Sequence, residues 1–310
     1  MKYVEINGLY KRFGEVNALE NLNLSIEKGE IFGLLGPNGA GKSTTINILC
    51  SLLEKDRGSI KICNKELNKN DSETRAKLGI VPQDLALFED MTSLENIMFF
   101  GSLYGLKGND LKEKALQALE FVGIENTKRL SKTFSGGMKR RLNIACGIVH
   151  NPKLLILDEP TVGIDPQSRN HIMKSIKTLN QNGCTIIYTT HYMEEVEVLC
   201  NNIAIIDKGR VIASGTKESL KAIIIDKNKF EIMVNDITEI NEKEICEIKG
   251  IDSVEFKDNK ILVSIEREIN SLNEFILYLS KKSIKILDIK SNVVTLEDVF
   301  LNLTGRKLRD

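Results

Sequence analysis

The feature that most constrains this sequence is a glycine-rich segment between an apolar run and a helix-forming run. Its pattern is G-x-x-x-x-G-K-S-T, and its members are Gly36, Pro37, Asn38, Gly39, Ala40, Gly41, Lys42, Ser43 and Thr44. Residues 31–35 predict a buried strand, and residues 45–49 have helical spacing. In a strand–loop–helix unit, backbone N–H groups and the positive end of the helix converge on one anion. The segment therefore predicts a nucleotide phosphate site, with Lys42 facing the β- and γ-phosphates and Ser43 binding Mg²⁺.

The bulk composition excludes several classes of protein. With 310 residues, the chain is long enough for about two domains. Its 43 basic and 43 acidic residues balance, so we expect no nucleic-acid partner. No uncharged apolar stretch of about 18 residues occurs, and the first residues alternate like a strand, so we expect neither a membrane-spanning helix nor a signal peptide. The six cysteines form no C-x-x-C pair, which favours reduced thiols in a cytosolic protein over a disulfide framework.

Residues 1–220 have the order of elements typical of an α/β domain. Short antiparallel strands are expected first, at residues 3–9, 16–19 and 22–26. Helical spacing from residue 93 to about residue 141 indicates a helical subdomain. The runs 154–157 and 185–190 have no polar interruption, as in central parallel strands, and residues 203–213 resemble a closing hairpin.

Residues 228–310 are predicted to form a second, smaller α+β domain. A charged, turn-like stretch near residues 220–228 marks the boundary. Beyond it, the pattern predicts the order βαββαβ, which makes a small sheet with helices on one face. The strands are expected at 230–234, 253–256, 261–265 and 284–289, and the helices at 239–247 and 272–279.

Polar side chains end several of the predicted strands. Asp158 and Glu159 follow an aliphatic strand, where Asp158 suits a carboxylate on the magnesium side and Glu159 suits a base that polarises water for attack on the γ-phosphate. The alternative is an ordinary acidic surface turn. Gln83 and His191 also end strands, where site residues of open α/β sheets gather, although a single histidine is more often structural.

A second glycine-containing segment, Ser135-Gly136-Gly137, precedes an amphipathic helix. Ser135 is a candidate N-cap, because its hydroxyl can accept from a free backbone N–H of the first turn. The two glycines allow a ligand to approach the start of the helix closely.

In this order, the motifs of residues 1–220 resemble those of the ATP-binding subunits of ABC transporters. The matching positions are the Walker A loop at 36–44, the Q-loop glutamine Gln83, the signature Ser135-Gly136-Gly137, the Walker B strand at 154–159 with its catalytic glutamate Glu159, the D-loop at 163–165 and the switch histidine His191. Phe13 stands at the family's aromatic position that stacks on adenine, with Tyr10 as an alternative.

The resemblance implies a P-loop NTPase of the ABC type, with an antiparallel β subdomain and a helical subdomain, that binds ATP and Mg²⁺ and hydrolyses ATP. It implies that Gln83 acts in catalysis and also binds the metal beside Ser43 and Asp158, and that Asp165 lies at the nucleotide. In this family two copies pair head to tail, so each ATP lies between the Walker A loop of one copy and the signature of the other. The implied partners are a second copy and integral membrane permease subunits, at the cytoplasmic side of the cell membrane.

One position departs from the family pattern. The signature usually ends in glutamine, and here that place is Met138. Methionine cannot donate a hydrogen bond, so a polar contact from this side chain is lost, while the contacts from the serine and the glycines remain. We therefore expect ATP hydrolysis to survive.

The tail at residues 295–306 resembles the closing segment of ATPases that serve exporters of drugs, antibiotics or polysaccharides. It is also an amphipathic helix pattern, capped by Thr295 and stopped by Gly305, and the two interpretations are compatible. The preferred prediction is the motor subunit of such an exporter, whose transported compound the sequence does not identify. The alternatives are a soluble ABC-type switch without transport and, for residues 228–310, a regulatory module that binds a small molecule.

Overall fold

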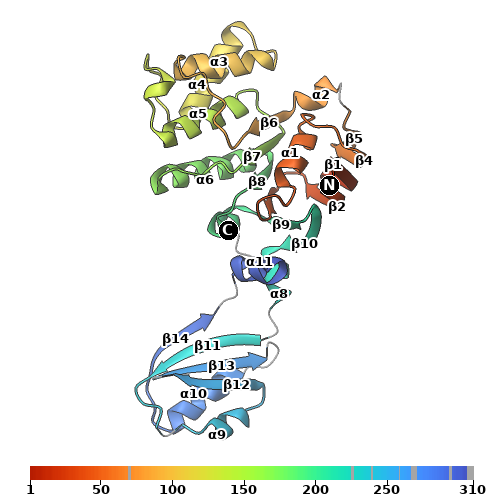
Figure 1. Ribbon diagram of the computed structural model, residues 1–310. Helices are drawn as coiled ribbons and strands as arrows, with labels where there is room; N and C mark the ends of the chain where they lie inside the picture. Colours follow the sequence, from red (N-terminus) through yellow and green to blue (C-terminus); the bar gives the residue numbers. More distant parts are fainter. Residues whose placement is uncertain are drawn as a thin grey trace. The chain divides into compact units, whose positions relative to one another are not determined.

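The computed structural model describes residues 1–68, 71–224, 227–238, 240–257, 259–266, 271–292 and 295–305. The chain divides into two compact units, one formed by Met1–Lys217 with Leu303–Asp310 and the other by Glu218–Asn302 (Figure 1). Among the described residues there is no helix with the length and apolarity that a membrane crossing demands.

The first unit is built around a six-stranded sheet. The order of its strands is β10 (Arg210–Thr216), β9 (Asn202–Asp207), β3 (Ile31–Leu35), β8 (Thr185–Thr189), β7 (Leu154–Asp158) and β6 (Leu78–Val81). The five strands from β9 to β6 are parallel, and β10 pairs antiparallel with β9. Strand β8 is buried along its whole length and β7 is buried from Leu154 to Leu157, which confirms the prediction of central strands covered on both faces.

A smaller antiparallel sheet forms the predicted β subdomain. Its order is β2 (Val16–Glu27), β1 (Lys2–Phe13), β4 (Arg57–Ile62) and β5 (Lys65–Glu66). The expectation of separate strands at 16–19 and 22–26 was wrong, because β2 runs through both. Asn21 has a φ of 53°, and the pairing with β1 shifts register between Leu22 and Leu19. A bulge thus lets one strand continue where the sequence indicates a break.

The helical subdomain is present. It consists of α3 (Ser93–Leu103), α4 (Gly108–Phe121) and α5 (Gly136–Ile148), with a 3₁₀ turn at Ser131–Thr133. These three helices pack against one another, as Figure 1 shows. The other helices of this unit are α1 (Lys42–Leu49), α2 (Ser72–Arg75), α6 (Pro166–Gln181) and α7 (Met193–Leu199), and α8 (Lys217–Ala222) begins at its boundary.

The second unit has the predicted order βαββαβ. Its elements are β11 (Lys227–Val234), α9 (Glu242–Cys246), β12 (Ile251–Lys257), β13 (Lys260–Glu266), α10 (Ser271–Lys281) and β14 (Ile286–Asn292). The sheet order is β12-β13-β11-β14, and all neighbours are antiparallel. Buried side chains such as Ile232, Val263 and Phe275 give the unit a core of its own.

The tail forms the predicted helix, α11 (Leu296–Thr304). Thr295 and Asp298 cap it reciprocally: Thr295 Oγ1 accepts from Asp298 N at 3.2 Å, and Asp298 Oδ2 accepts from Thr295 N at 2.8 Å. Gly305 follows with a φ of 66°, the left-handed conformation of a helix stop. The last residue of the tail segment, Arg306, lies outside the described residues.

Candidate nucleotide site

A cleft of about 490 Å³ lies over the loop between β3 and α1. It is lined by Ala18, Asn38, Gly39, Ala40, Gly41, Lys42, Ser43, Thr44, Gln83, Glu159, Val162 and His191. The glycine loop and the segments of Gln83, Glu159 and His191, all predicted from the sequence as site segments, therefore meet at this cleft. They do so because β3, β6, β7 and β8 are parallel, and their carboxyl ends lie at one edge of the sheet.

Two glycines of the loop are required by their surroundings. A Cβ on Gly36 would lie 2.3 Å from the carbonyl oxygen of Ile206, on β9. Gly41 has a φ of 108°, and a Cβ there would lie 2.8 Å from the carbonyl oxygen of Ala18. Only glycine allows the loop to fold this tightly against β9 and β2.

The side chain of Lys42 is hydrogen-bonded to the glycine loop that precedes it. Its Nζ donates to the carbonyl oxygens of Gly36 at 2.6 Å and of Pro37 at 3.1 Å, and the residue is buried. Burial lowers the pKa of the ammonium group, while the charges of Glu159 and Asp158 act in the opposite direction. A desolvated cation beside free helix N–H groups is suited to binding a phosphate, because charge-assisted bonds replace the weaker ones to the carbonyls.

Thr189, at the end of β8, connects the two predicted carboxylates. Its hydroxyl donates to Asp158 Oδ1 at 2.6 Å and accepts from the backbone N–H of Glu159 at 2.9 Å. Glu159 has a φ of 47°, a conformation that residues other than glycine rarely adopt and that is concentrated at functional sites. Thr189 was not predicted as a site residue, although a polar residue that ends an aliphatic strand just before His191 is a recognisable signal.

Glu159 and His191 are in direct contact. The Nδ1 atom of His191 lies 3.3 Å from Oε2 of Glu159, although the two residues are 32 positions apart in the chain. Both side chains line the cleft. The parallel pairing of β7 with β8 produces this contact, since it places the residues that follow the two strands side by side.

The magnesium ligands predicted from the sequence offer hard oxygen donors. Ser43 lines the cleft, and Asp158 ends the strand that leads to Glu159. The described residues contain no group of three or more His, Cys, Asp or Glu able to hold a metal ion. This donor set fits Mg²⁺ bound together with a nucleotide, because Mg²⁺ takes only one or two protein oxygens and completes its shell with phosphate oxygens and water.

The signature segment is not among the residues that line this cleft. Ser135 caps α5, its Oγ accepting from Met138 N at 3.3 Å, and Ser135 and Gly136 are exposed. A Cβ on Gly137 would lie 2.3 Å from Ser168 Oγ and 3.1 Å from Asp165 Oδ2. The start of α5 thus packs closely on the start of α6.

Asp165 caps α6, accepting from Ser168 N at 2.9 Å, and this bond lowers the pKa of its carboxyl group. It therefore lies beside the signature segment and does not line the cleft. The predicted contact of Asp165 with the nucleotide stays a prediction, and α6, the helix that Asp165 caps, was not predicted from the sequence.

The aromatic candidates for adenine lie outside the cleft lining. Phe13 ends β1 with 48% of its surface exposed, and Lys11 Nζ lies 5.5 Å from the centre of its ring. Tyr10 lines a different hollow, together with Glu20 and Arg210. The adenine contact stays a prediction.

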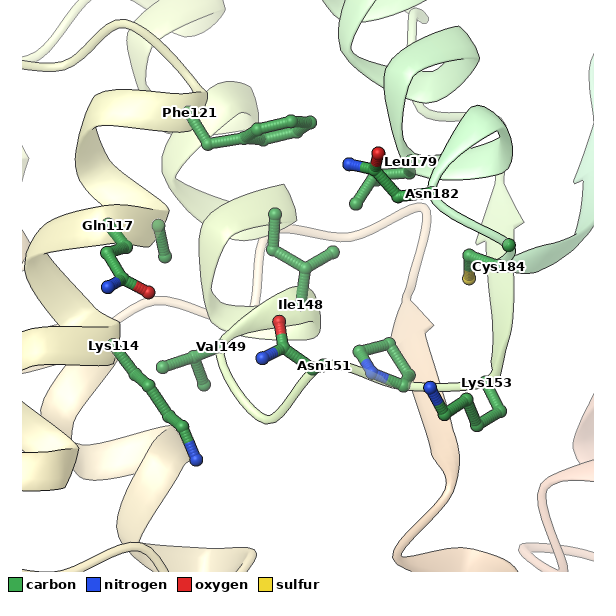
Figure 2. Close-up of a pocket in the computed structure, with 13 residues that line it drawn as sticks. Lys114, Gln117, Phe121, Ile148, Val149, Asn151, Lys153, Leu179, Asn182 and Cys184 are labelled. Carbon is green, nitrogen blue, oxygen red and sulfur yellow. The ribbon is translucent and has the colours of Figure 1, made fainter.

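A second hollow of about 400 Å³ lies between α4, the end of α5 and the turn from α6 to β8 (Figure 2). None of the predicted site residues lines it. Its Lys114 is paired with Asp110 at 3.1 Å, and burial raises the pKa of the Cys184 thiol to about 11. A thiol with so high a pKa is not a reactive nucleophile at neutral pH, so the cleft over the glycine loop is the better candidate site.

The family model described as "ABC transporter" matches residues 19–162. The linearmycin resistance ATP-binding protein LnrL of Bacillus subtilis (strain 168) is 42% identical, over 99% of this chain and 100% of that protein. The daunorubicin/doxorubicin resistance ATP-binding protein DrrA of Streptomyces peucetius is 34% identical, over 99% and 94%. The Nod factor export ATP-binding protein I of Ralstonia nicotianae is 35% identical, over 99% and 95%.

Solved structures give the same assignment. The cbiO1 subunit of an ABC transporter complex from Clostridium perfringens has a TM-score of 0.66 at 32% identity, over 72% of this chain and 92% of that one. The dimeric ATP-binding cassette MJ0796 bound to ADP and Pi has a TM-score of 0.63 at 29% identity, over 69% and 98%. The resemblance and the fold class predicted from the motifs are confirmed, and this chain belongs to the ATP-binding ATPase subunits of the ABC transporter family.

Proposed function

We propose that this chain is the ATP-hydrolysing motor of an exporter of drugs, antibiotics or related compounds, and that it works with separate membrane subunits. The observation that carries the proposal is the similarity of nearly the whole chain, second unit included, to ATP-binding proteins named for drug resistance and for export. A match confined to the first unit would support ATP hydrolysis alone.

The proposed roles follow from the lining of the cleft. Lys42 and the N–H groups of the glycine loop bind the phosphates, and Glu159 polarises the attacking water. His191, in contact with Glu159, holds that carboxylate and contacts the γ-phosphate. Ser43, Asp158 and Gln83 would hold Mg²⁺, which neutralises charge on the phosphates when it is bound.

We propose that the complete site needs a second copy of the chain, placed head to tail. The signature Ser135-Gly136-Gly137 and Asp165 lie together at the starts of α5 and α6 and line no part of the cleft in their own chain. Ser135 and Gly136 are exposed, and their N–H and hydroxyl groups can supply the γ-phosphate of a partner's ATP with further donors. The dimeric form of the similar cassette MJ0796 supports this arrangement.

The proposed docking surface for the membrane subunit follows Gln83 in the chain. Four large apolar side chains are exposed on the loop after Gln83 and on α3: Leu85, Phe88, Phe99 and Leu103. The rings of Phe88 and Phe99 are 4.7 Å apart. An apolar patch on the loop that follows a cleft residue suits a partner that must sense ATP. We propose that this partner holds the chain peripherally at the cytoplasmic side of the membrane.

Two side chains of the signature helix fix the loop that carries this surface. Arg140 donates to the carbonyl oxygen of Pro82 at 3.1 Å, and Asn143 Oδ1 accepts from Ala86 N at 3.3 Å. The loop is therefore tied to α5 on both sides of Gln83. This link supports a motor in which a movement of the signature helix shifts the membrane partner.

For residues 228–310 we propose a role in assembly or in regulation. A chain ended after residue 224 separates the two. Loss of the ATP-dependent dimer would assign the second unit to assembly, while a dimer with raised ATPase activity would assign it to regulation.

The exporter proposal is tested with the neighbouring genes. Co-expression with an encoded six-helix membrane protein should produce efflux of an antibiotic, and the Glu159→Gln chain in the same membranes should not. Neighbouring genes that encode soluble proteins alone, with no complex in membranes, would overturn the exporter in favour of the soluble switch.

A further inference from the structure

A buried carboxylate lies behind the cleft, on α7. Glu195 is 1% exposed and stands four positions after His191. One of its oxygens, Oε2, accepts three hydroxyl hydrogen bonds: from Tyr188 at 2.7 Å, from Thr161 at 2.9 Å and from Thr190 at 2.9 Å. All three donors are at most 1% exposed, so the carboxylate has exchanged water for these hydroxyls.

The other oxygen of Glu195 faces a cation. Oε1 lies 3.5 Å from Nε of Arg169, which stands in the first turn of α6, and within the described residues neither atom has a hydrogen-bond partner. The guanidinium carbon of Arg169 lies 4.3 Å from the centre of the Tyr192 ring. The Tyr192 ring in turn lies 4.3 Å from that of His191.

Each partner of Glu195 belongs to a segment that carries a proposed site residue. Thr161 stands two positions after Glu159, and Thr190 directly precedes His191 and accepts from Tyr192 N at 3.0 Å. Arg169 stands four positions after Asp165. The carboxylate therefore joins the turns after β7 and β8 to the start of α6.

The chemistry of these contacts calls for an ionised carboxylate. Three hydroxyl donors and a guanidinium surround it, and an ionised glutamate accepts without donating. A glutamine of the same shape would keep one acceptor, but its amide N–H groups would face Arg169 across 3.5 Å, donor against donor. It would also lose the charge that makes the hydrogen bonds strong.

We propose that Glu195 is a positioning residue for ATP hydrolysis. Its buried charge holds the turns that carry Glu159 and His191 at the spacing observed in the cleft. The proposal rests on the proposed roles of these two residues. Because Glu195 does not line the cleft, it acts on the hydrolysis step and leaves ATP affinity unchanged.

The first test compares Glu195→Gln with Glu194→Gln in the full chain. Glu194 is the adjacent, exposed glutamate of the same helix turn, so it controls for the loss of one negative charge. We expect Glu195→Gln to lower kcat by about 10- to 100-fold, with KM for ATP changed less than about twofold, and Glu194→Gln to behave as wild type. A kcat for Glu195→Gln equal to that of Glu194→Gln would overturn the proposal.

If Glu195→Gln does not fold, a second pair of variants tests the role of Glu195 through two of its hydroxyl donors. Thr190→Val and Tyr188→Phe each remove one hydroxyl from Glu195, but only Thr190 adjoins a cleft residue. We expect Thr190→Val to lower kcat by about tenfold, and Tyr188→Phe to lower Tm with little change in kcat. A loss of kcat that follows the loss of Tm in both variants would make Glu195 a structural residue only.

The double variant Glu195→Gln/His191→Ala shows whether Glu195 acts on hydrolysis through His191 or independently of it. If Glu195 acts by positioning His191, then Glu195→Gln should cost little further activity once His191 is alanine. A full additional loss would overturn positioning through His191 and would assign the effect of Glu195 to the turn that carries Glu159. If Glu159→Gln hydrolysed ATP at the wild-type rate, both the proposed site roles and the role of Glu195 would be overturned. If Glu159→Gln were inactive and Glu195→Gln had wild-type activity, the role of Glu195 alone would be overturned.

Discussion

Two helix starts in the first unit are proposed to bind phosphate, and they differ in their surroundings: α1 begins at the cleft, and α5 begins beside α6. Helix α1 has no side-chain cap, so its N–H groups are left for a phosphate, and Lys42, Glu159 and His191 converge beside it. Helix α5 is capped by Ser135, which is exposed, and Ser135, Gly136 and Gly137 do not line that cleft. We propose that the start of α1 binds a phosphate within its own chain, whereas the start of α5 donates to a phosphate bound by a second copy.

Glu159→Gln should have the largest effect, and it tests whether ATP joins the start of α1 in one copy to the start of α5 in another. The carboxamide removes the base, so hydrolysis should fall by about 10²- to 10⁴-fold, while the phosphate contacts of α1 remain. ATP should then hold two copies together through the two kinds of helix start. Size-exclusion chromatography with ATP should show a dimer, and a variant that stays monomeric would count against a composite site.

Lys42→Ala tests phosphate binding at the start of α1 alone. It removes the buried cation that faces the phosphates, and loss of a charged hydrogen bond of about 1.5–3 kcal/mol corresponds to a fall in ATP affinity of about 10- to 150-fold. Equilibrium binding of a fluorescent ATP analogue measures the change. Lys139→Ala, on α5 and paired with Glu89, is the matched control and should bind the analogue as wild type does. Unchanged affinity in Lys42→Ala would refute the placement of the phosphates.

The close packing of α5 on α6 is tested with a pair of adjacent glycines. Gly137→Ala places a Cβ 2.8 Å from Ser168 Cβ, so we expect a loss of about 1–3 kcal/mol in the free energy of unfolding. Gly136→Ala meets its nearest atom only at 4.0 Å and should be nearly neutral. Urea denaturation distinguishes the two, and equal stabilities would show that the helix starts are not in contact.

The smallest expected effect is that of Ser135→Ala. Loss of the N-cap should lower the free energy of unfolding by about 1 kcal/mol. ATP binding by the monomer should not change, because Ser135 does not line the cleft. The ATP-dependent dimer should weaken, which a dilution series in the Glu159→Gln background measures. A lower affinity of the monomer for ATP would place the signature in its own chain's site.

Much of this fold follows from local patterns. A strand buried on both faces leaves a continuous apolar run, and such runs predict β7 and β8. An element buried on one face leaves a periodic pattern, and such patterns beyond residue 228 predict the order βαββαβ. Bulges leave no such period. Strand β2 was therefore divided in two at Asn21, whose left-handed conformation depends on pairing with β1.

The candidate site was predictable to the extent that its residues belong to continuous motifs. The loop from Gly36 to Thr44 carries its own geometry, since its glycines, lysine and serine are adjacent and the flanking strand and helix fix their directions. Thr189 and Glu195 belong to no such motif. Each acts through contacts with residues more than 25 positions away, as in the bonds from Thr189 to Asp158 and from Thr161 to Glu195.

The phosphate loop, the two carboxylates at a strand end and the signature segment can each be identified from adjacent residues. Which of them share a cleft depends on how distant segments pair and pack. Parallel pairing of β7 with β8 brings His191 to 3.3 Å from Glu159, while the signature packs on the start of α6 and is not among the residues that line the cleft. The physical reason is that hydrogen bonding between strands and packing between helices join residues far apart in the chain, and no local pattern records these distances.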